Sequence, residues 1–165
     1  MNAWHDFFLA QAAATATLTG LVFVGVSINL QKIVSDPRSG LAGRAGEALI
    51  LLVAVLTVSV LLLVPGQGPG IIGAEILVVG FISLGWVGAI QLPRLRSWGA
   101  TRPELRGPLV ARVLLGQIAT LLLIVAGVAV LSVGLAGLYW LVAGTVFSII
   151  AALADAWVLL VEINR

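Results

Sequence analysis

Cysteine is absent from this 165-residue sequence, and histidine occurs once, at His5. The absence of cysteine excludes disulfides, thiol redox chemistry, cysteine-ligated metals and cysteine nucleophiles. A metal site that used His5 would take Asp6 and Glu75 as its acidic ligands. They lack the spacing of a helical metal motif such as H-E-x-x-H, so we predict no metal site.

Charged side chains are also scarce. Only 10% of the residues are charged and 61% are hydrophobic, with a mean hydropathy of +1.17. A soluble domain has about 25% charged and about 45–50% apolar residues. Because a short chain buries only part of its surface in a core, most of this apolar excess must contact lipid. We predict a single transmembrane domain over residues 1–165.

Long apolar runs make up most of the sequence. They cover roughly residues 7–31, 46–64, 71–92, 109–133 and 137–162. Each approaches or exceeds the ~20 residues that a helix needs to cross a bilayer. All 6 prolines lie between these runs or at their ends, where a missing backbone donor is tolerated. Short Gly-rich connectors join the second run to the third and the fourth run to the fifth, which predicts two helical hairpins. With the first run added, we expect an all-α polytopic bundle of five transmembrane helices.

The basic residues all fall on one side of this predicted topology. The 9 residues are Lys32, Arg38, Arg44, Arg94, Arg96, Arg102, Arg106, Arg112 and Arg165. The positive-inside rule makes that side cytoplasmic, and an odd number of spans then places the N-terminus outside. Topology also explains the net charge of +2 better than nucleic-acid binding, which requires a basic face on a folded domain.

The first apolar run has two distinct faces at ~100° per residue. One face consists of small residues that permit close helix contact in lipid, namely Ala13, Ala16, Gly20 and Ser27. The other is a weakly polar stripe that comprises Gln11, Thr15, Leu18, Val22, Gly25 and Asn29. The stripe either forms hydrogen bonds between helices or lines a water-filled ion path. Because both faces are suited to contacts other than lipid, we expect this helix to be central in the protomer or in an oligomer.

The fourth and fifth runs each have one side rich in small residues. These sides carry Gly116, Thr120, Gly127 and Gly134 on the fourth run, and Gly144, Ser148, Ala151, Asp155 and Glu162 on the fifth. We expect the two sides to meet in the second hairpin, because small side chains let helices approach closely.

Asp155 lies in the apolar segment AALADAWVLLVEINR, where an ionised carboxylate is costly unless it is paired or hydrated. At ~1.5 Å per residue, Gln117 lies at a matching depth, and Arg112 is the nearest base. Glu47 and Glu162 lie closer to the boundary, where acids are commonly solvated. Asp155 is then either a structural partner of Arg112 or Gln117, or part of a proton- or cation-binding site with these neighbours.

The segment PRLRSWGATRPELRGP places a basic cluster beside the inner leaflet. Its members are Arg94, Arg96, Trp98, Arg102 and Arg106. Such a cluster suits anionic lipid, at ~1 kcal/mol per basic residue near the surface. The alternative is that these arginines only set the topology.

No catalytic constellation is present, since the sequence lacks G-x-S-x-G, S-x-x-K and any histidine within an apolar run. It also lacks a P-loop, and its G-x-G-x-x-G match at residues 68–73 lies in a connector between two apolar runs rather than after a strand, so it predicts no nucleotide site. We expect no enzyme activity and no cofactor. The favoured function is a small homo-oligomeric ion channel or ion-permeation protein. The alternative is a non-conducting adaptor or regulator of another membrane protein.

Two stretches carry a resemblance, WHDFFLAQAAATATLTGLVFVGVSINLQKI and EALILLVAVLTVSVLLLVPGQ. They resemble small bacterial multi-pass integral membrane proteins that have no established activity. The likeness is strongest over the first two predicted spans. It implies a bacterial cytoplasmic (inner) membrane as the location and no particular substrate.

Overall fold

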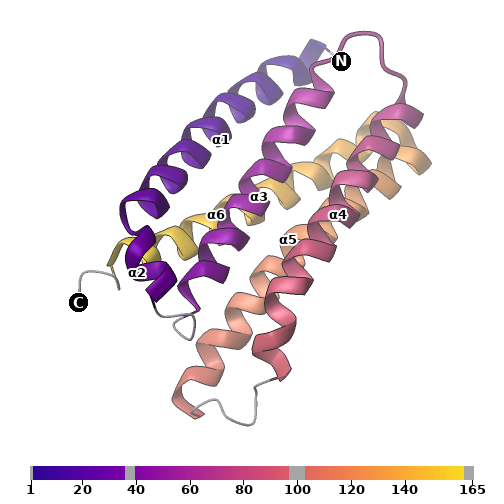
Figure 1. Ribbon diagram of the computed structural model, residues 1–165. Helices are drawn as coiled ribbons and strands as arrows, with labels where there is room; N and C mark the ends of the chain where they lie inside the picture. Colours follow the sequence, from indigo (N-terminus) through magenta and orange to yellow (C-terminus); the bar gives the residue numbers. More distant parts are fainter. Residues whose placement is uncertain (1, 36–39, 97–102, 162–165) are drawn as a thin grey trace.

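The computed structural model describes residues 2–35, 40–96 and 103–161, all of which are helical or in short connections (Figure 1). The elements are α1 (Asn2–Ile28), α2 (Leu30–Ser35), α3 (Leu41–Leu62), α4 (Pro69–Arg96), α5 (Pro103–Val133), the 3-10 turn η3 (Gly134–Gly137) and α6 (Leu138–Val161). The predicted all-α fold is confirmed.

Four helical stretches are long and apolar enough to cross a membrane. They are Trp4–Ile28, Leu41–Leu62, Pro69–Arg96 and Arg106–Leu159. The last stretch of 54 residues contains η3 and most of α5 and α6. It folds back at Gly134, whose φ of 71° is the left-handed conformation that ends many helices at a glycine. Beyond this turn α6 packs along α5.

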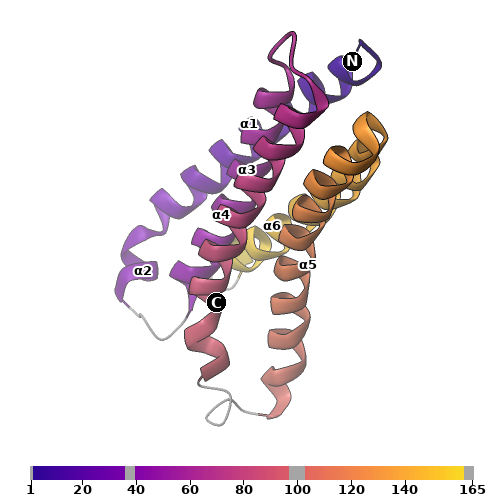
Figure 2. The same cartoon turned by 90° about the vertical axis from the view of Figure 1, so that its right-hand side faces the viewer.

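The helix at the centre of the protomer is α3. It packs against α1, α4 and α6, while α5 packs against α4 and α6 (Figure 2). Of the four stretches, α3 is the most buried and α1 the least. Within the protomer the expected central place of the first helix is therefore wrong. The physical reason is that α3 is apolar on several sides, with Leu51, Leu52 and Val55 all fully buried.

Two helices extend past their apolar runs. α4 continues through Pro93 to Arg96, and α5 begins before Pro108. A 28-residue helix such as α4 is ~42 Å long, which exceeds the ~30 Å hydrocarbon core and enters the headgroup region. Part of the expected basic loop is thus helical, because Arg94 and Arg96 end α4 and Arg106 lies in α5.

The glycine-rich side of α5 mostly faces α4. A Cβ added at Gly127 would lie 2.7 Å from Leu77 and 3.0 Å from the carbonyl oxygen of Gly73, both in α4. Gly144 of α6 does contact α5, where its Cβ would lie 3.2 Å from Leu122. The expectation that both small-residue sides meet each other is wrong for Gly127, because α4 occupies that side of α5.

Candidate functional site: a buried polar cluster at the basic end of the bundle

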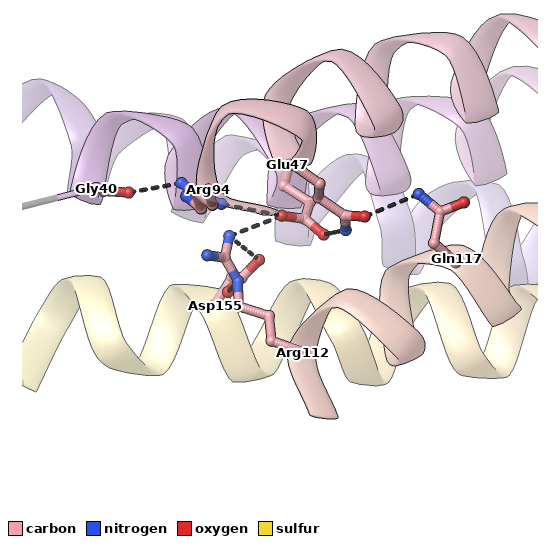
Figure 3. Close-up of polar contacts among 7 residues, drawn as sticks. Gly40, Glu47, Arg94, Arg112, Gln117 and Asp155 are labelled. Atoms are coloured by element: carbon pink, nitrogen blue, oxygen red, sulfur yellow. Dashed lines mark hydrogen bonds and ion pairs between the residues drawn. The ribbon is translucent and has the colours of Figure 1, made fainter. Parts of the chain in front are cut away.

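Six polar side chains from four helices meet at the end of the bundle where the described arginines lie (Figure 3). This polar cluster consists of Glu47 from α3, Gln91 and Arg94 from α4, Arg112 and Gln117 from α5, and Asp155 from α6. These four helices form a ring, and the cluster ties all of them together near one end.

Glu47 is the centre of the cluster. Its Oε2 accepts a 2.7 Å hydrogen bond from Arg112 Nη2 and forms a 3.7 Å ion pair with Arg94 Nη1. Its Oε1 accepts a 2.6 Å hydrogen bond from Gln91 Nε2. Glu47 is only 1% exposed, so the expectation of a solvated boundary acid is wrong. Gln91 and Arg94 of α4 and Arg112 of α5 lie against it.

Asp155 is paired with Arg112. Arg112 Nη2 donates a 3.0 Å hydrogen bond to Oδ2, and Nε forms an ion pair with Oδ1. The Nε contact is a charge contact rather than a well-directed hydrogen bond. Asp155 is 3% exposed. Of the two partners proposed from the sequence, Arg112 is therefore the one that Asp155 contacts.

Gln117 is joined to the cluster through Gln91. Its Nε2 donates a 2.8 Å hydrogen bond to Gln91 Oε1, and through Gln91 it is linked to Glu47. Five residues on a helix correspond to ~140° around the axis, so Arg112 and Gln117 point in different directions from α5. The pairing of Gln117 with Asp155, expected from depth, is thus replaced by a bond to α4.

Gln91 and Arg94 also belong to the polar cluster, although neither is among the ion-site residues predicted from the sequence. Arg94 Nη2 donates a 2.9 Å hydrogen bond to the Gly40 carbonyl oxygen just before α3, besides its ion pair with Glu47. Arg94 was expected at the lipid surface and instead faces inward. The available signal was spacing, since residues three apart on a helix share a face. Gln91 is an amide near the end of an apolar run, three residues before Arg94.

Two glycines make room for the cluster. A Cβ at Gly116 would lie 2.5 Å from Glu47 Oε1 and 2.9 Å from Gln91 Nε2. A Cβ at Gly43 would overlap the Arg94 guanidinium. A larger residue at either position would require the Glu47, Gln91 or Arg94 side chain to shift.

The charges within the cluster balance. Glu47 and Asp155 face Arg94 and Arg112, and each carboxylate oxygen contacts at least one donor. Such mutual neutralisation is what allows ionised groups to lie among apolar helices. The geometry supports a structural clamp that joins α3, α4, α5 and α6.

A cleft of about 260 Å³ adjoins the cluster. Its charged lining consists of Arg44, Glu47, Arg112 and Asp155, and its apolar lining consists of Pro108, Ala111, Leu115, Ala151, Ala154 and Val158. In this cleft, side chains of the cluster border open space that a ligand can enter.

The predicted polar stripe of α1 faces the interior. Gln11 is buried and its Nε2 donates a 3.0 Å hydrogen bond to Ser59 Oγ of α3. Thr15 is buried and its hydroxyl donates to the Gln11 carbonyl oxygen at 2.7 Å. Val22 is buried, while Leu18, Gly25 and Asn29 are half-buried. The stripe thus lies between α1 and its neighbours in the same protomer.

The small-residue face of α1 is the outward one. Ala13, Ala16, Gly20 and Ser27 are all exposed, and a Cβ added at Gly20 would meet nothing within 4 Å. Of the remaining predicted site residues, Arg96 is exposed and Arg106 half-buried. Glu162, Trp98 and Arg102 lie outside the described residues.

Comparison of the chain with protein families, with curated proteins and with solved structures finds no match. The resemblance over the first two predicted spans therefore stays a prediction. The composition and the long apolar helices lead to a coarser conclusion on their own: the chain is an integral membrane protein that contacts the lipid bilayer through several transmembrane helices.

Proposed function

We propose that the chain spans a bacterial cytoplasmic membrane five times, through α1, α3, α4, α5 and α6, with its N-terminus outside. The one-sided basic residues support this orientation. The described arginines lie at the helix ends near the polar cluster, whereas Trp4 of α1 packs edge-to-face against Tyr139 at the start of α6, with ring centroids 5.2 Å apart. Aromatic side chains of this kind favour a membrane interface.

Within that topology, we infer that the protein is a non-conducting adaptor or regulator of another membrane protein. It assembles as a homo-oligomer and has no catalytic activity. The orientation of α1 carries this inference. Gln11 of its polar stripe is hydrogen-bonded to Ser59 of α3, and Thr15 and Val22 are buried inside the protomer, so the stripe is not available to line a path between subunits. Its outward face is the small-residue face, which suits close contact with α1 of a second copy.

The mass of the complex in a native membrane mimic tests the assembly. The wild-type protein should be larger than a monomer, and Gly20→Leu should reduce the mass because leucine forces the two α1 backbones apart. Gly85→Leu is the matched control, since Gly85 is also an exposed helical glycine with nothing within 4 Å of an added Cβ. A Gly20→Leu protein with unchanged mass would contradict assembly through this face.

Ion permeation is the second candidate, because the cleft brings Asp155 and Glu47 to the edge of open space. If a permeating proton or cation binds Asp155, wild-type protein should carry ion flux into liposomes and Asp155→Asn should lower that flux or change its selectivity. Flux no greater than that of protein-free liposomes is the result expected for the adaptor. Flux that Asp155→Asn alters would favour the channel instead.

A further inference from the structure

The cleft beside the polar cluster lies where two helices diverge. α5 and α6 pack together next to η3, while their opposite ends lie apart (Figure 2). The cleft opens between these ends, and Arg112 and Asp155 cross it from the two sides. It is bounded by α3 through Arg44 and Glu47.

Arg44 is the charged residue of the cleft that the cluster does not neutralise. Both oxygens of Glu47 and both oxygens of Asp155 already contact Arg94, Arg112 or Gln91. Among the described residues, Arg44 has no ion-pair or hydrogen-bond partner for its guanidinium. Among the described side chains of the cluster and the cleft, three arginines thus face two carboxylates, an excess of one positive charge.

The other walls of the cleft are apolar and accessible from the bilayer. Pro108, Ala111 and Ala154 are exposed and Val158 is half-buried. A ligand that fits this lining carries an anionic group for Arg44 and an apolar part for the walls between α5 and α6. A guanidinium binds phosphate with paired hydrogen bonds, which makes arginine well suited to such a group.

We propose that this cleft is a phosphate-binding site, with Arg44 as the anion ligand, and that an anionic phospholipid of the leaflet on the basic side occupies it. The apolar walls favour the lipid over a free phosphate, because part of an acyl chain then covers Ala111 and Ala154. The site differs from the basic segment around Arg96, since its anion ligand lies on α3.

Native mass spectrometry in a neutral detergent tests this site. Phosphatidylglycerol, phosphatidylcholine and glycerol 3-phosphate are each titrated into the wild-type protein and the variants. Phosphatidylglycerol should bind tightest. Arg44→Gln should weaken its binding about tenfold or more, as expected for loss of a hydrogen-bonded charge. The control Arg96→Gln should weaken it less than about fivefold, as expected for one charge at a membrane surface. Ala154→Phe fills the cleft and should also weaken binding.

The outcomes separate the sources of phosphate. Glycerol 3-phosphate that binds as tightly as phosphatidylglycerol, and is lost in Arg44→Gln, would support the site and assign it to a soluble phosphate. Phosphatidylcholine that binds as tightly as phosphatidylglycerol would overturn the proposal. So would an Arg44→Gln effect no larger than that of Arg96→Gln, or unchanged binding by Ala154→Phe. Unaltered thermal unfolding in the neutral detergent shows that each variant is folded.

Discussion

Replacement of Arg112 by glutamine should destabilise the bundle more than any other single change in the polar cluster. Arg112 contacts both Glu47 and Asp155, which are 1% and 3% exposed. Arg112→Gln therefore leaves Asp155 without its partner and removes the shortest charged contact of Glu47. Breaking a buried ion pair by removing one partner costs about 3–5 kcal/mol, and we expect the free energy of unfolding to fall by that amount.

Asp155→Asn should cost less. Arg112 keeps its 2.7 Å hydrogen bond to Glu47 in this variant, so no charge is stranded alone. The loss of a hydrogen bond to a charged group is worth about 1.5–3 kcal/mol. The double variant Arg112→Gln with Asp155→Asn should be more stable than Arg112→Gln alone, because the stranded carboxylate is gone. Coupling between residues in contact is about 0.5–3 kcal/mol.

The assay is equilibrium unfolding in mild detergent with increasing sodium dodecyl sulfate, followed by circular dichroism or tryptophan fluorescence. Arg96→Gln is the matched control, because Arg96 is exposed at the end of α4 and surface changes stay within about 0.5 kcal/mol. If Arg112→Gln were as stable as Arg96→Gln, the cluster would not hold the helices together. If the double variant lost the sum of the two single losses, Arg112 and Asp155 would not be coupled.

Two further predictions concern packing and topology. Gly116→Ala should destabilise the bundle by about 1–3 kcal/mol, because its Cβ would lie 2.5 Å from Glu47 Oε1, whereas Gly88→Ala should be tolerated since nothing lies within 4 Å of its Cβ. Equal unfolding free energies of these two variants would argue against close packing around Glu47. Because the sequence has no cysteine, single cysteines at Gly68, Leu135 and Ala100 report topology without background. A membrane-impermeant thiol reagent should label the first two on intact cells and not the third, and labelling at Ala100 would reverse the proposed orientation.

Much of the fold follows from local properties of the chain. The length and apolarity of a run, compared with the thickness of a bilayer, predict a transmembrane helix without knowledge of its neighbours. The predicted runs 46–64 and 71–92 accordingly fall largely within α3 and α4. The ends of α4 and α5 were less predictable, because a helix continues past the hydrocarbon core wherever headgroups and water accept its polar residues.

The polar cluster was predictable in part. Asp155 and Arg112 were recognised because a charge in an apolar run requires a partner and few candidates lie at the same depth. The burial of Glu47 was not predicted, because the sequence gives its distance from the end of the apolar run and does not give the helices that cover it. It is buried against α5 at Gly116, where an added Cβ would lie 2.5 Å from its Oε1.

The sequence by itself determined that this protein lies in a membrane, is helical and has its basic residues at one end, because these properties depend on position along the chain. The tertiary structure decided which side chains meet. Depth is one coordinate, and the direction around each helix axis and the identity of the neighbouring helix are others. Gln117 matches Asp155 in depth, yet it points toward Gln91 on α4. The polar stripe of α1 likewise turned inward, since only the packing of α1 against α3 sets which face meets lipid.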